Sequence, residues 1–361
     1  MPKSDKLASE FAPELALLKI GACVAVVILH SSVPVIFSHG ATGWGDWWIG
    51  MFLNALSRFA VPVFIMISGA LSLNLATTDS TNFLRRRARR ILPLTLIFVT
   101  AYLLFFHWLR GDALTINSIW QRVVMSEQYE HLYFLFLLIQ LWALTPWFWL
   151  FFKGPKQHLL VNLIGLTTLV TLVWQPRQFM PLLFVPYISY YLWGGYLWKH
   201  RANLVRHSWL APKWLVSIYL LSALSMAIIT RWLTVYQVTD NLFFLKYQSP
   251  LVMISARAIF TSSLHLTKHL QKYRPILALA QGHTLAIYLL SPAVLFIFTQ
   301  LPIFRDRLAE VWTVLPLSGL CLVVGIMANS AWQRVQYWYA HALANRFSSR
   351  RSTPHLDRAN R

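Results

Sequence analysis

Five ionisable side chains stand out inside long apolar stretches of this sequence, where a charge is costly to keep. They are Lys19 and His30 in the first stretch, Arg58 in the second, His107 near the end of the third and Arg257 in the eighth. Acidic residues are nearly all confined to the segments between the stretches. An ionisable group at membrane depth is a functional hypothesis by default, and cations without carboxylate partners favour an anionic or oxyanionic ligand.

The spacing of Lys19, His30 and Arg58 predicts a shared site. Lys19 and His30 are eleven residues apart, which in an α-helix is three turns plus a small offset, so both project from one face about 16 Å apart along the axis. Arg58 follows the expected start of the second helix by about two turns, which puts it at nearly the depth of His30 in the outer half of the membrane. A histidine and an arginine at matching depth can form one polar site.

Each of these residues also has a structural interpretation. His30 can simply hydrogen-bond a neighbouring helix, Arg58 can bind backbone carbonyls, and Lys19 can reach the lipid headgroups. His107, beside Trp108 at the end of its stretch, is typical of an interfacial residue. Arg257 fits a structural and a functional role equally well.

A dense basic run precedes the third apolar stretch. It contains five arginines within six residues, namely Arg85, Arg86, Arg87, Arg89 and Arg90. Guanidinium groups bind phosphate oxygens through paired, charge-assisted hydrogen bonds, so this run can hold a polyphosphate. It also has the composition of a topology signal that attracts anionic lipid, and the two roles are compatible.

The composition places these residues in a membrane protein. Hydrophobic residues make up 57% of the 361-residue chain and charged residues only 12%, a balance outside the range of soluble domains of this size. Apolar runs of about 20 residues predict an all-α bundle of about ten transmembrane helices. The expected spans are 14–36, 50–74, 91–109, 131–152, 158–174, 182–198, 214–235, 247–264, 284–301 and 312–333.

Charge asymmetry between the connecting segments predicts the orientation. Of the 32 Lys and Arg residues, 22 lie in alternate segments that include both ends, and 7 lie in the opposite loops or, for Arg231, near the outer end of the adjoining span. The positive-inside rule therefore predicts that both termini are cytoplasmic. We expect one membrane domain over residues 1–335 and a basic cytoplasmic tail over 336–361, disordered or bound to headgroups.

Other function classes fit the sequence poorly. The net charge of +20 is spread over short loops instead of one folded face, which argues against nucleic-acid binding. Cys23 and Cys321 are too few and too far apart to predict a disulfide framework or a metal site, and we interpret them as packing residues. The first apolar run continues past the length of a signal-peptide core, which predicts a retained helix.

Four segments, in order along nearly the whole chain, resemble acyltransferase family 3, whose members move acyl groups from cytoplasmic acyl-coenzyme A to extracytoplasmic glycans. The matching features are a basic residue eleven positions before a histidine, here Lys19 and His30; the segment 57–69 with Arg58, Phe64, Ser68 and Gly69; the arginine run ending in Pro93; and HisLeuTyrPheLeu from His131. A weaker match covers 284–292, where many relatives carry a histidine at the position of Ser291. Within the family the chain is most similar to the stand-alone type, such as the enterobacterial common antigen O-acetyltransferase.

The resemblance implies a set of roles. His30 would act as general base on an acceptor hydroxyl and Arg58 would stabilise the oxyanion or hold the acyl carbonyl, with a covalent acyl-histidine intermediate as a second possibility. Lys19 with Arg86, Arg87, Arg89 and Arg90 would bind the acyl-coenzyme A phosphates. His131, Tyr288 and Arg257 would contact the acceptor.

It also implies partners and a location. Acetyl-coenzyme A would serve as a co-substrate, with no permanently bound cofactor and no metal. The acceptor would be an extracytoplasmic or lipid-linked glycan, and the protein would lie among membrane lipids in the bacterial inner membrane, without nucleic acid. The sequence leaves open acetyl or succinyl transfer, the acceptor and the oligomeric state. A rival function, transport of a glycan or a lipid-linked sugar, also fits ten spans with buried cations, although no paired repeat with broken helices is present.

Overall fold

The fold is helical throughout the residues that the computed structural model describes, which are 11–38, 43–75, 79–111, 114–115, 117, 120, 132–173, 182–236 and 242–351. Regular elements within these ranges are α-helices and short 3-10 turns. The α-helices are α1 (Pro13–Phe37), α2 (Trp44–Ser57), α3 (Ala60–Leu73), α4 (Ser80–Arg110), α6 (Tyr133–Phe152), α7 (Leu160–Val173), α8 (Ile188–Lys199), α9 (Arg201–Leu204), α10 (Pro212–Val235), α11 (Pro250–Ser263), α12 (Thr267–Leu270), α13 (Arg274–Gln281), α14 (Thr284–Thr299), α15 (Pro302–Arg305) and α16 (Val314–Arg351).

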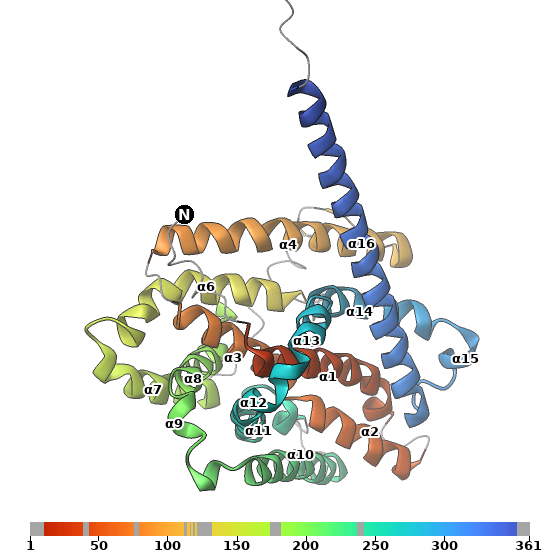
Figure 1. Cartoon of the computed structure of the whole chain (residues 1–361). Coiled ribbons are helices and arrows are strands. Elements are labelled where there is room, and N and C mark those ends of the chain that lie inside the picture. The colour runs from red at the N-terminus through yellow and green to blue at the C-terminus, as the bar shows by residue number, and fades with distance from the viewer. Residues whose placement is uncertain are drawn as a thin grey trace, which may run out of the picture.

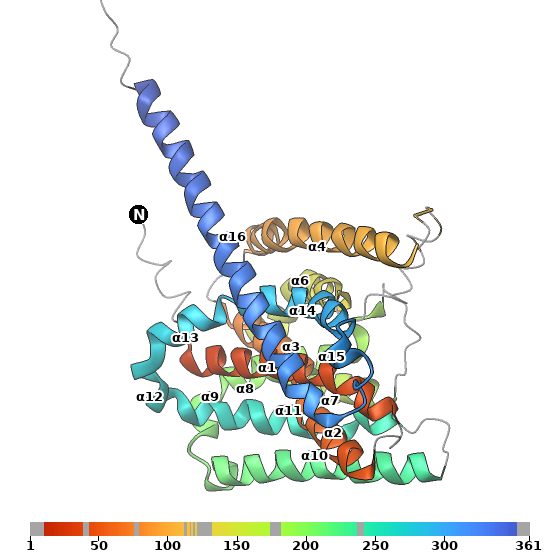
Figure 2. The ribbon, with the colours of Figure 1, turned by 90° about the vertical axis from the view of Figure 1, so that its right-hand side faces the viewer.

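Helix α1 occupies the centre of the bundle and contacts α2, α3, α11, α13, α14 and α16. Figures 1 and 2 show α4 and α10 on opposite sides of the molecule, with α1 and α3 between them. Helix α1 is apolar around most of its circumference, which suits a position surrounded by other helices. The side chains of α1 are consequently placed inside the protein, where they can build a site.

Six helical stretches of the described chain are long and apolar enough to cross a membrane, or seven if the bent pair formed by 243–281 and 284–299 is one span. They coincide with expected spans 14–36, 50–74, 91–109, 131–152, 214–235 and 312–333. The expected spans 158–174 and 182–198 correspond to shorter helices of 14 and 12 residues. In the second case Pro186 begins a 3-10 turn at Val185–Tyr187, so the α-helix starts only at Ile188. The ten-span topology and the cytoplasmic ends stay predictions.

The outward surface of the bundle is apolar, the reverse of a soluble protein. On α4, Leu96 is 69% exposed and Ile97 is 61% exposed, and on α10 Leu221 is 61% exposed. Contiguous exposed apolar surface on long helices is stable only in contact with lipid or another apolar partner. The chain is therefore a multi-pass membrane protein.

The second expected span is interrupted at Arg58. Helix α2 ends at Ser57 and α3 begins at Ala60, within one helical stretch of 30 residues from Trp44 to Leu73. At the junction the Arg58 amide donates to the Ala55 carbonyl three residues earlier, at 3.3 Å. This tighter turn sets the direction in which the Arg58 side chain leaves the helix.

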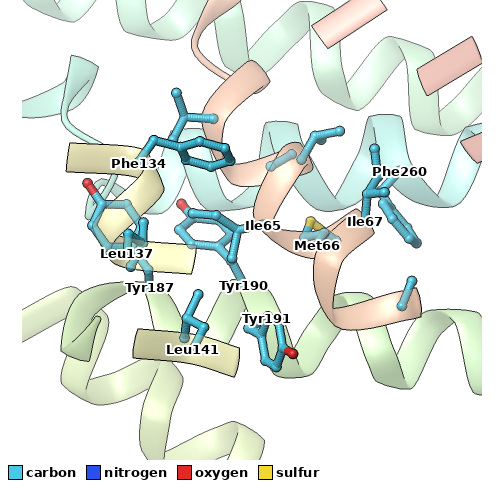
Figure 3. Close-up of a cluster of buried hydrophobic side chains, with 14 of the residues drawn as sticks. Ile65, Met66, Ile67, Phe134, Leu137, Leu141, Tyr187, Tyr190, Tyr191 and Phe260 are labelled. Atoms are coloured by element: carbon cyan, nitrogen blue, oxygen red, sulfur yellow. The ribbon is translucent and has the colours of Figure 1, made fainter. Parts of the chain in front are cut away.

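Helices α3 and α8 pack at backbone contact. A Cβ atom on Gly69 would lie 1.9 Å from the Tyr191 carbonyl oxygen, and one on Gly194 would lie 2.0 Å from that of Met66. Only glycine permits this approach, which is typical of small-residue packing between membrane helices. Figure 3 shows the resulting core, in which the adjacent residues Tyr190 and Tyr191 of α8 direct their hydroxyl groups in different directions.

The C-terminal segment after residue 335 differs in part from the prediction. We expected a disordered or headgroup-bound segment from residue 336. Helix α16 instead continues to Arg351 and projects beyond the other helices in Figures 1 and 2, so the segment is not disordered up to that residue, while headgroup binding stays a prediction. Residues 334–351 contain good helix formers and no Gly or Pro, which explains the continuation. The division into domains at residue 335 stays a prediction.

Candidate functional site

His30 lies on α1 inside the bundle and is only half-buried. Neither of its ring nitrogens forms a hydrogen bond with the described residues, and neither is sealed from solvent. The two serines that follow it bond to their own helix: Ser31 donates to the Val27 carbonyl and Ser32 to the Leu29 carbonyl, each at 2.9 Å. The imidazole is thus held on a rigid helix with its nitrogens available to another molecule.

Asn54 connects the helix of His30 to Arg58. Its Nδ2 donates to the Leu29 carbonyl at 3.2 Å and to Ser32 Oγ at 2.9 Å, on either side of His30 in the sequence. Its Oδ1 accepts a hydrogen bond from Arg58 Nε at 2.8 Å. Asn54 is fully buried, so these bonds act in a low-dielectric interior where an unmade bond would be costly. This bridge fixes the positions of His30 and Arg58 relative to each other.

Arg58 reaches into the interior of the bundle. Its charge lies within electrostatic reach of His30 and of the Tyr133 and Tyr247 phenols. Within the described chain Nε makes the one hydrogen bond of the guanidinium, which leaves the donors of both terminal nitrogens available. The side chain is half-buried, so a bound molecule can reach these donors.

Aromatic residues from four separate segments gather near Arg58. The tyrosine cluster, as we name it, consists of Tyr133 on α6, Tyr187 before α8, Tyr247 before α11 and Tyr288 on α14, which interact electrostatically with one another. The Tyr133 and Tyr187 ring centroids are 6.4 Å apart and those of Tyr187 and Tyr247 are 6.2 Å apart. Such amphipathic rings offer both an apolar surface and hydroxyl groups to a ligand.

Hydrogen bonds from neighbouring helices hold this cluster. The Tyr190 hydroxyl donates to the Tyr247 backbone carbonyl at 2.5 Å. On α14, beside Pro292, the Tyr102 hydroxyl of α4 donates to the Leu289 carbonyl at 2.8 Å and accepts from the Ala293 amide at 3.3 Å. The Tyr102 side chain thus bonds two backbone groups of α14 next to Pro292, which satisfies polar groups that lipid could not. These bonds hold the turn of α14 that follows Tyr288.

A second basic group lies near the start of α1. Lys19 is half-buried and within electrostatic reach of Arg90 on α4. Neither cation pairs with a carboxylate in the described part of the structure. Two neighbouring cations without an acidic partner repel each other, and a bound anion would relieve that repulsion.

The arginine run is not uniform. Arg87 points inward: its Nη2 donates to Ser72 Oγ at 3.3 Å and its guanidinium lies 4.8 Å from the Trp142 ring centroid. Arg85, Arg86, Arg89 and Arg90 are exposed. Asp79 caps α4 by accepting a hydrogen bond from the Asn82 amide at 3.0 Å, and hydrogen bonds from Asn82 hold the pKa of this carboxyl below its ordinary value.

The remaining expected site residues lie elsewhere. Arg257 on α11 donates to Thr168 Oγ1 at 3.4 Å and stacks 4.5 Å from the Trp193 ring centroid, so it holds α11 to α7 and α8. His107 is exposed near the end of α4. His131 falls outside the described residues. Ser291 donates to the Tyr288 carbonyl at 3.2 Å, while Cys23 and Cys321 are free thiols packed in the core.

Sequence reasoning missed Asn54 and most of the tyrosine cluster. Asn54 precedes Arg58 by four residues in an apolar run, a spacing that places both on one helix face and that could have identified it. Tyr133, Tyr187 and Tyr247 come from separate segments, and only the folded bundle brings them together.

An imidazole with accessible nitrogens, a guanidinium with free donors and an aromatic cluster are groups that could activate a hydroxyl and stabilise a developing oxyanion. No curated protein and no solved structure matches the chain. A family model described as an acyltransferase domain matches residues 13–330, from the first residue of α1 into α16. The chain therefore belongs to acyltransferase family 3.

Proposed function

We propose that this membrane acyltransferase is an O-acetyltransferase that moves the acetyl group of cytoplasmic acetyl-coenzyme A to a hydroxyl of an extracytoplasmic or lipid-linked glycan. It spans the bacterial inner membrane ten times with both termini in the cytoplasm. The family supports acyl transfer in a membrane protein. The donor, the acceptor and the topology are our proposals, supported by the placement of the charged residues.

The observation that carries the mechanism is the bridge through Asn54. A base and an oxyanion-binding cation must be held in fixed relative positions, because small displacements remove most of their effect. Asn54 bonds Arg58 Nε and the backbone of α1 next to His30 at distances of 2.8 Å and 3.2 Å.

In the proposed reaction the His30 imidazole removes the proton of the acceptor hydroxyl as its oxygen attacks the thioester carbonyl carbon. The terminal nitrogens of Arg58 stabilise the negative charge on the carbonyl oxygen. The carbon–sulfur bond then breaks, and the imidazolium returns its proton to the coenzyme A thiolate. The products are the O-acetyl ester and free coenzyme A, so atoms and charges balance.

The polar groups along α1 suit a donor that enters from the cytoplasm. Lys19 and Arg90 form the basic group at the cytoplasmic end in our topology, and His30 lies about 16 Å further along the helix axis. The pantetheine arm would run along this face with the phosphates near Lys19. The tyrosine cluster, with Phe64 and Phe134 packed against Tyr288, is the proposed acceptor site.

Two assays test this function. Mass spectrometry of surface glycans from a strain that lacks the protein should show the loss of one O-acetyl ester, and expression of the wild type should restore it. Purified protein in nanodiscs should release free coenzyme A from acetyl-coenzyme A when a de-esterified glycan from that strain is added.

The same assays distinguish acetyl transfer from the two alternative functions, succinyl transfer and transport. A preference for succinyl-coenzyme A in the nanodisc assay would contradict acetyl transfer and keep the enzyme class. Unchanged ester content in the deletion strain, together with accumulation of an unexported glycan, would contradict acyl transfer and favour transport.

A further inference from the structure

A cavity of about 500 Å³ opens at the end of the bundle where α1 begins. Its walls come from the first turn of α1, the end of α3, the end of α8 with the start of α9, and α12 with the turn after it. Figure 2 shows the start of α1 together with α9, α12 and α13 at one end of the molecule. A cavity of this volume falls in the range of small-molecule and cofactor sites. We call it the N-terminal cavity.

Glu14 faces the N-terminal cavity with an unsatisfied carboxylate oxygen. Glu14 is only 3% exposed, and its Oε2 has no hydrogen-bond partner among the described residues. A buried carboxylate oxygen without a donor costs free energy, because water is lost and not replaced. An N–H or O–H donor on a molecule in the cavity would therefore be stabilised by a hydrogen bond to Glu14 Oε2.

The rest of the lining supplies an aromatic ring and cations. Trp198 is half-buried, and the guanidinium of the exposed Arg201 lies 4.2 Å from its ring centroid. Lys199 is exposed next to it, with Nζ donating to the Phe152 carbonyl at 2.6 Å. An acceptor inside, an indole at the wall and two cations at the rim fit a flat heterocycle that bears an amino group and an attached phosphate.

We propose that the N-terminal cavity binds the adenine nucleotide of the acyl donor, with the exocyclic amino group of adenine donating to Glu14. The ring would lie along Trp198, and the ribose phosphate would meet Lys199 and Arg201. This inference rests on the proposed use of acyl-coenzyme A. It assigns recognition of the nucleotide to residues outside the arginine run.

The position of Glu14 along α1 suits this assignment. Glu14 and His30 are sixteen residues apart on one continuous helix, about 24 Å along its axis. An extended pantetheine arm with its diphosphate covers a distance of that order. At about 100° per residue, the Glu14 and His30 side chains point about 160° apart around the helix. A donor with its base in the N-terminal cavity would therefore pass around α1, from the face of Glu14 to the face of Lys19 and His30, to bring its thioester beside His30.

The test measures donor binding to the full-length protein in phosphatidylcholine nanodiscs by calorimetry. The probes are acetyl-coenzyme A, its analogue with hypoxanthine in place of adenine, and S-acetyl-4′-phosphopantetheine, which lacks the nucleotide. We expect the wild type to bind the hypoxanthine analogue about tenfold more weakly than acetyl-coenzyme A, the value of one hydrogen bond to a charged group. Glu14→Gln should lose this preference and bind S-acetyl-4′-phosphopantetheine as the wild type does.

Arg201→Gln and Lys213→Gln form a matched pair, since each removes an exposed cation stacked on a tryptophan, but Lys213, 5.3 Å from the Trp214 ring centroid, lies outside the cavity. Only Arg201→Gln should weaken acetyl-coenzyme A binding. Because Arg201 is exposed, this variant keeps the proposal testable even if Glu14→Gln does not fold.

Four results would overturn the proposal. Equal binding of the adenine and hypoxanthine donors by the wild type would exclude recognition by Glu14. Competition by added phosphatidylethanolamine that disappears in Glu14→Gln would show that the cavity holds a zwitterionic lipid headgroup. No binding of acetyl-coenzyme A by the wild type would contradict the proposed function as well, whereas normal binding by the wild type and both cavity variants would contradict this inference alone.

Discussion

Asn54 Oδ1 accepts a hydrogen bond from Arg58 Nε at 2.8 Å, while the amide of the same side chain donates to Ser32 Oγ at 2.9 Å. One neutral residue therefore ties the proposed oxyanion-binding arginine to the helix that carries the proposed base. The bridge is made of ordinary hydrogen bonds: Asn54 bonds residues on either side of His30 in α1 and bonds the Arg58 side chain directly.

Asn54→Ala should lower kcat about 10- to 100-fold with little change in KM for the donor, because loss of the two supports costs about 1 to 3 kcal/mol in positioning. Asn54→Asp should recover part of the activity, since its carboxylate still accepts from Arg58. The matched control is Thr171→Val, which removes another buried interhelical hydrogen bond, from Thr171 Oγ1 to Ser189 Oγ at 2.9 Å. Equal losses of kcat in Asn54→Ala and Thr171→Val would contradict a positioning role for Asn54 and assign it to helix packing.

The arginine run should divide into two classes. Arg90→Gln should weaken acetyl-coenzyme A binding about tenfold and make it less sensitive to salt, because Arg90 is exposed near Lys19. Arg87→Gln should instead lower thermal stability, since it loses the contacts with Ser72 and Trp142. Calorimetry and thermal unfolding of both variants, after a check of membrane orientation, would separate them. Stable Arg87→Gln protein with wild-type unfolding temperature would contradict the assigned packing role.

Gly69→Ala should destabilise the protein strongly, because the new Cβ would overlap the Tyr191 carbonyl oxygen at 1.9 Å. Gly165→Ala on α7 is the matched control, since nothing lies within 4 Å of its added Cβ. Thermal unfolding in detergent measures both. Similar unfolding temperatures for the two variants would show that α3 and α8 do not pack as described.

The proposed topology predicts which single cysteines a membrane-impermeant reagent labels from outside. In a Cys23→Ala, Cys321→Ala background, cysteines within the expected outer loops should react, whereas those at residues 85–90 and 200–213 should not. These expected outer loops are 39–49, 110–130, 175–181, 236–246 and 302–311. Strong external labelling near residues 85–90 or 200–213 would reverse or break the assigned orientation.

The sequence predicted the pairing of His30 and Arg58 because depth in a membrane helix follows from simple counting along the chain. It could not predict which arginine of the run turns inward. Successive helical residues differ by about 100° in direction, and only the position of α6 determines that Arg87 meets Trp142.

Span lengths were predictable only in part. Hydropathy identified the long helices, but Pro186 and the 3-10 turn at Val185–Tyr187 shorten α8. The helical continuation of α16 to Arg351 was also missed, because a basic, Ser-containing composition resembles a disordered tail even where no residue breaks the helix.

The central claim is that His30 transfers the proton of the acceptor hydroxyl. The most direct measurement is acetyl transfer by purified His30→Ala in nanodiscs, together with its binding of acetyl-coenzyme A and its thermal unfolding. We predict that transfer falls by at least about 10² to 10⁴, while donor binding and unfolding temperature stay close to those of the wild type. Arg58→Lys should also be impaired, because one ammonium does not reproduce the planar donor pair of a guanidinium. Transfer by His30→Ala at a rate near that of the wild type would contradict the mechanism.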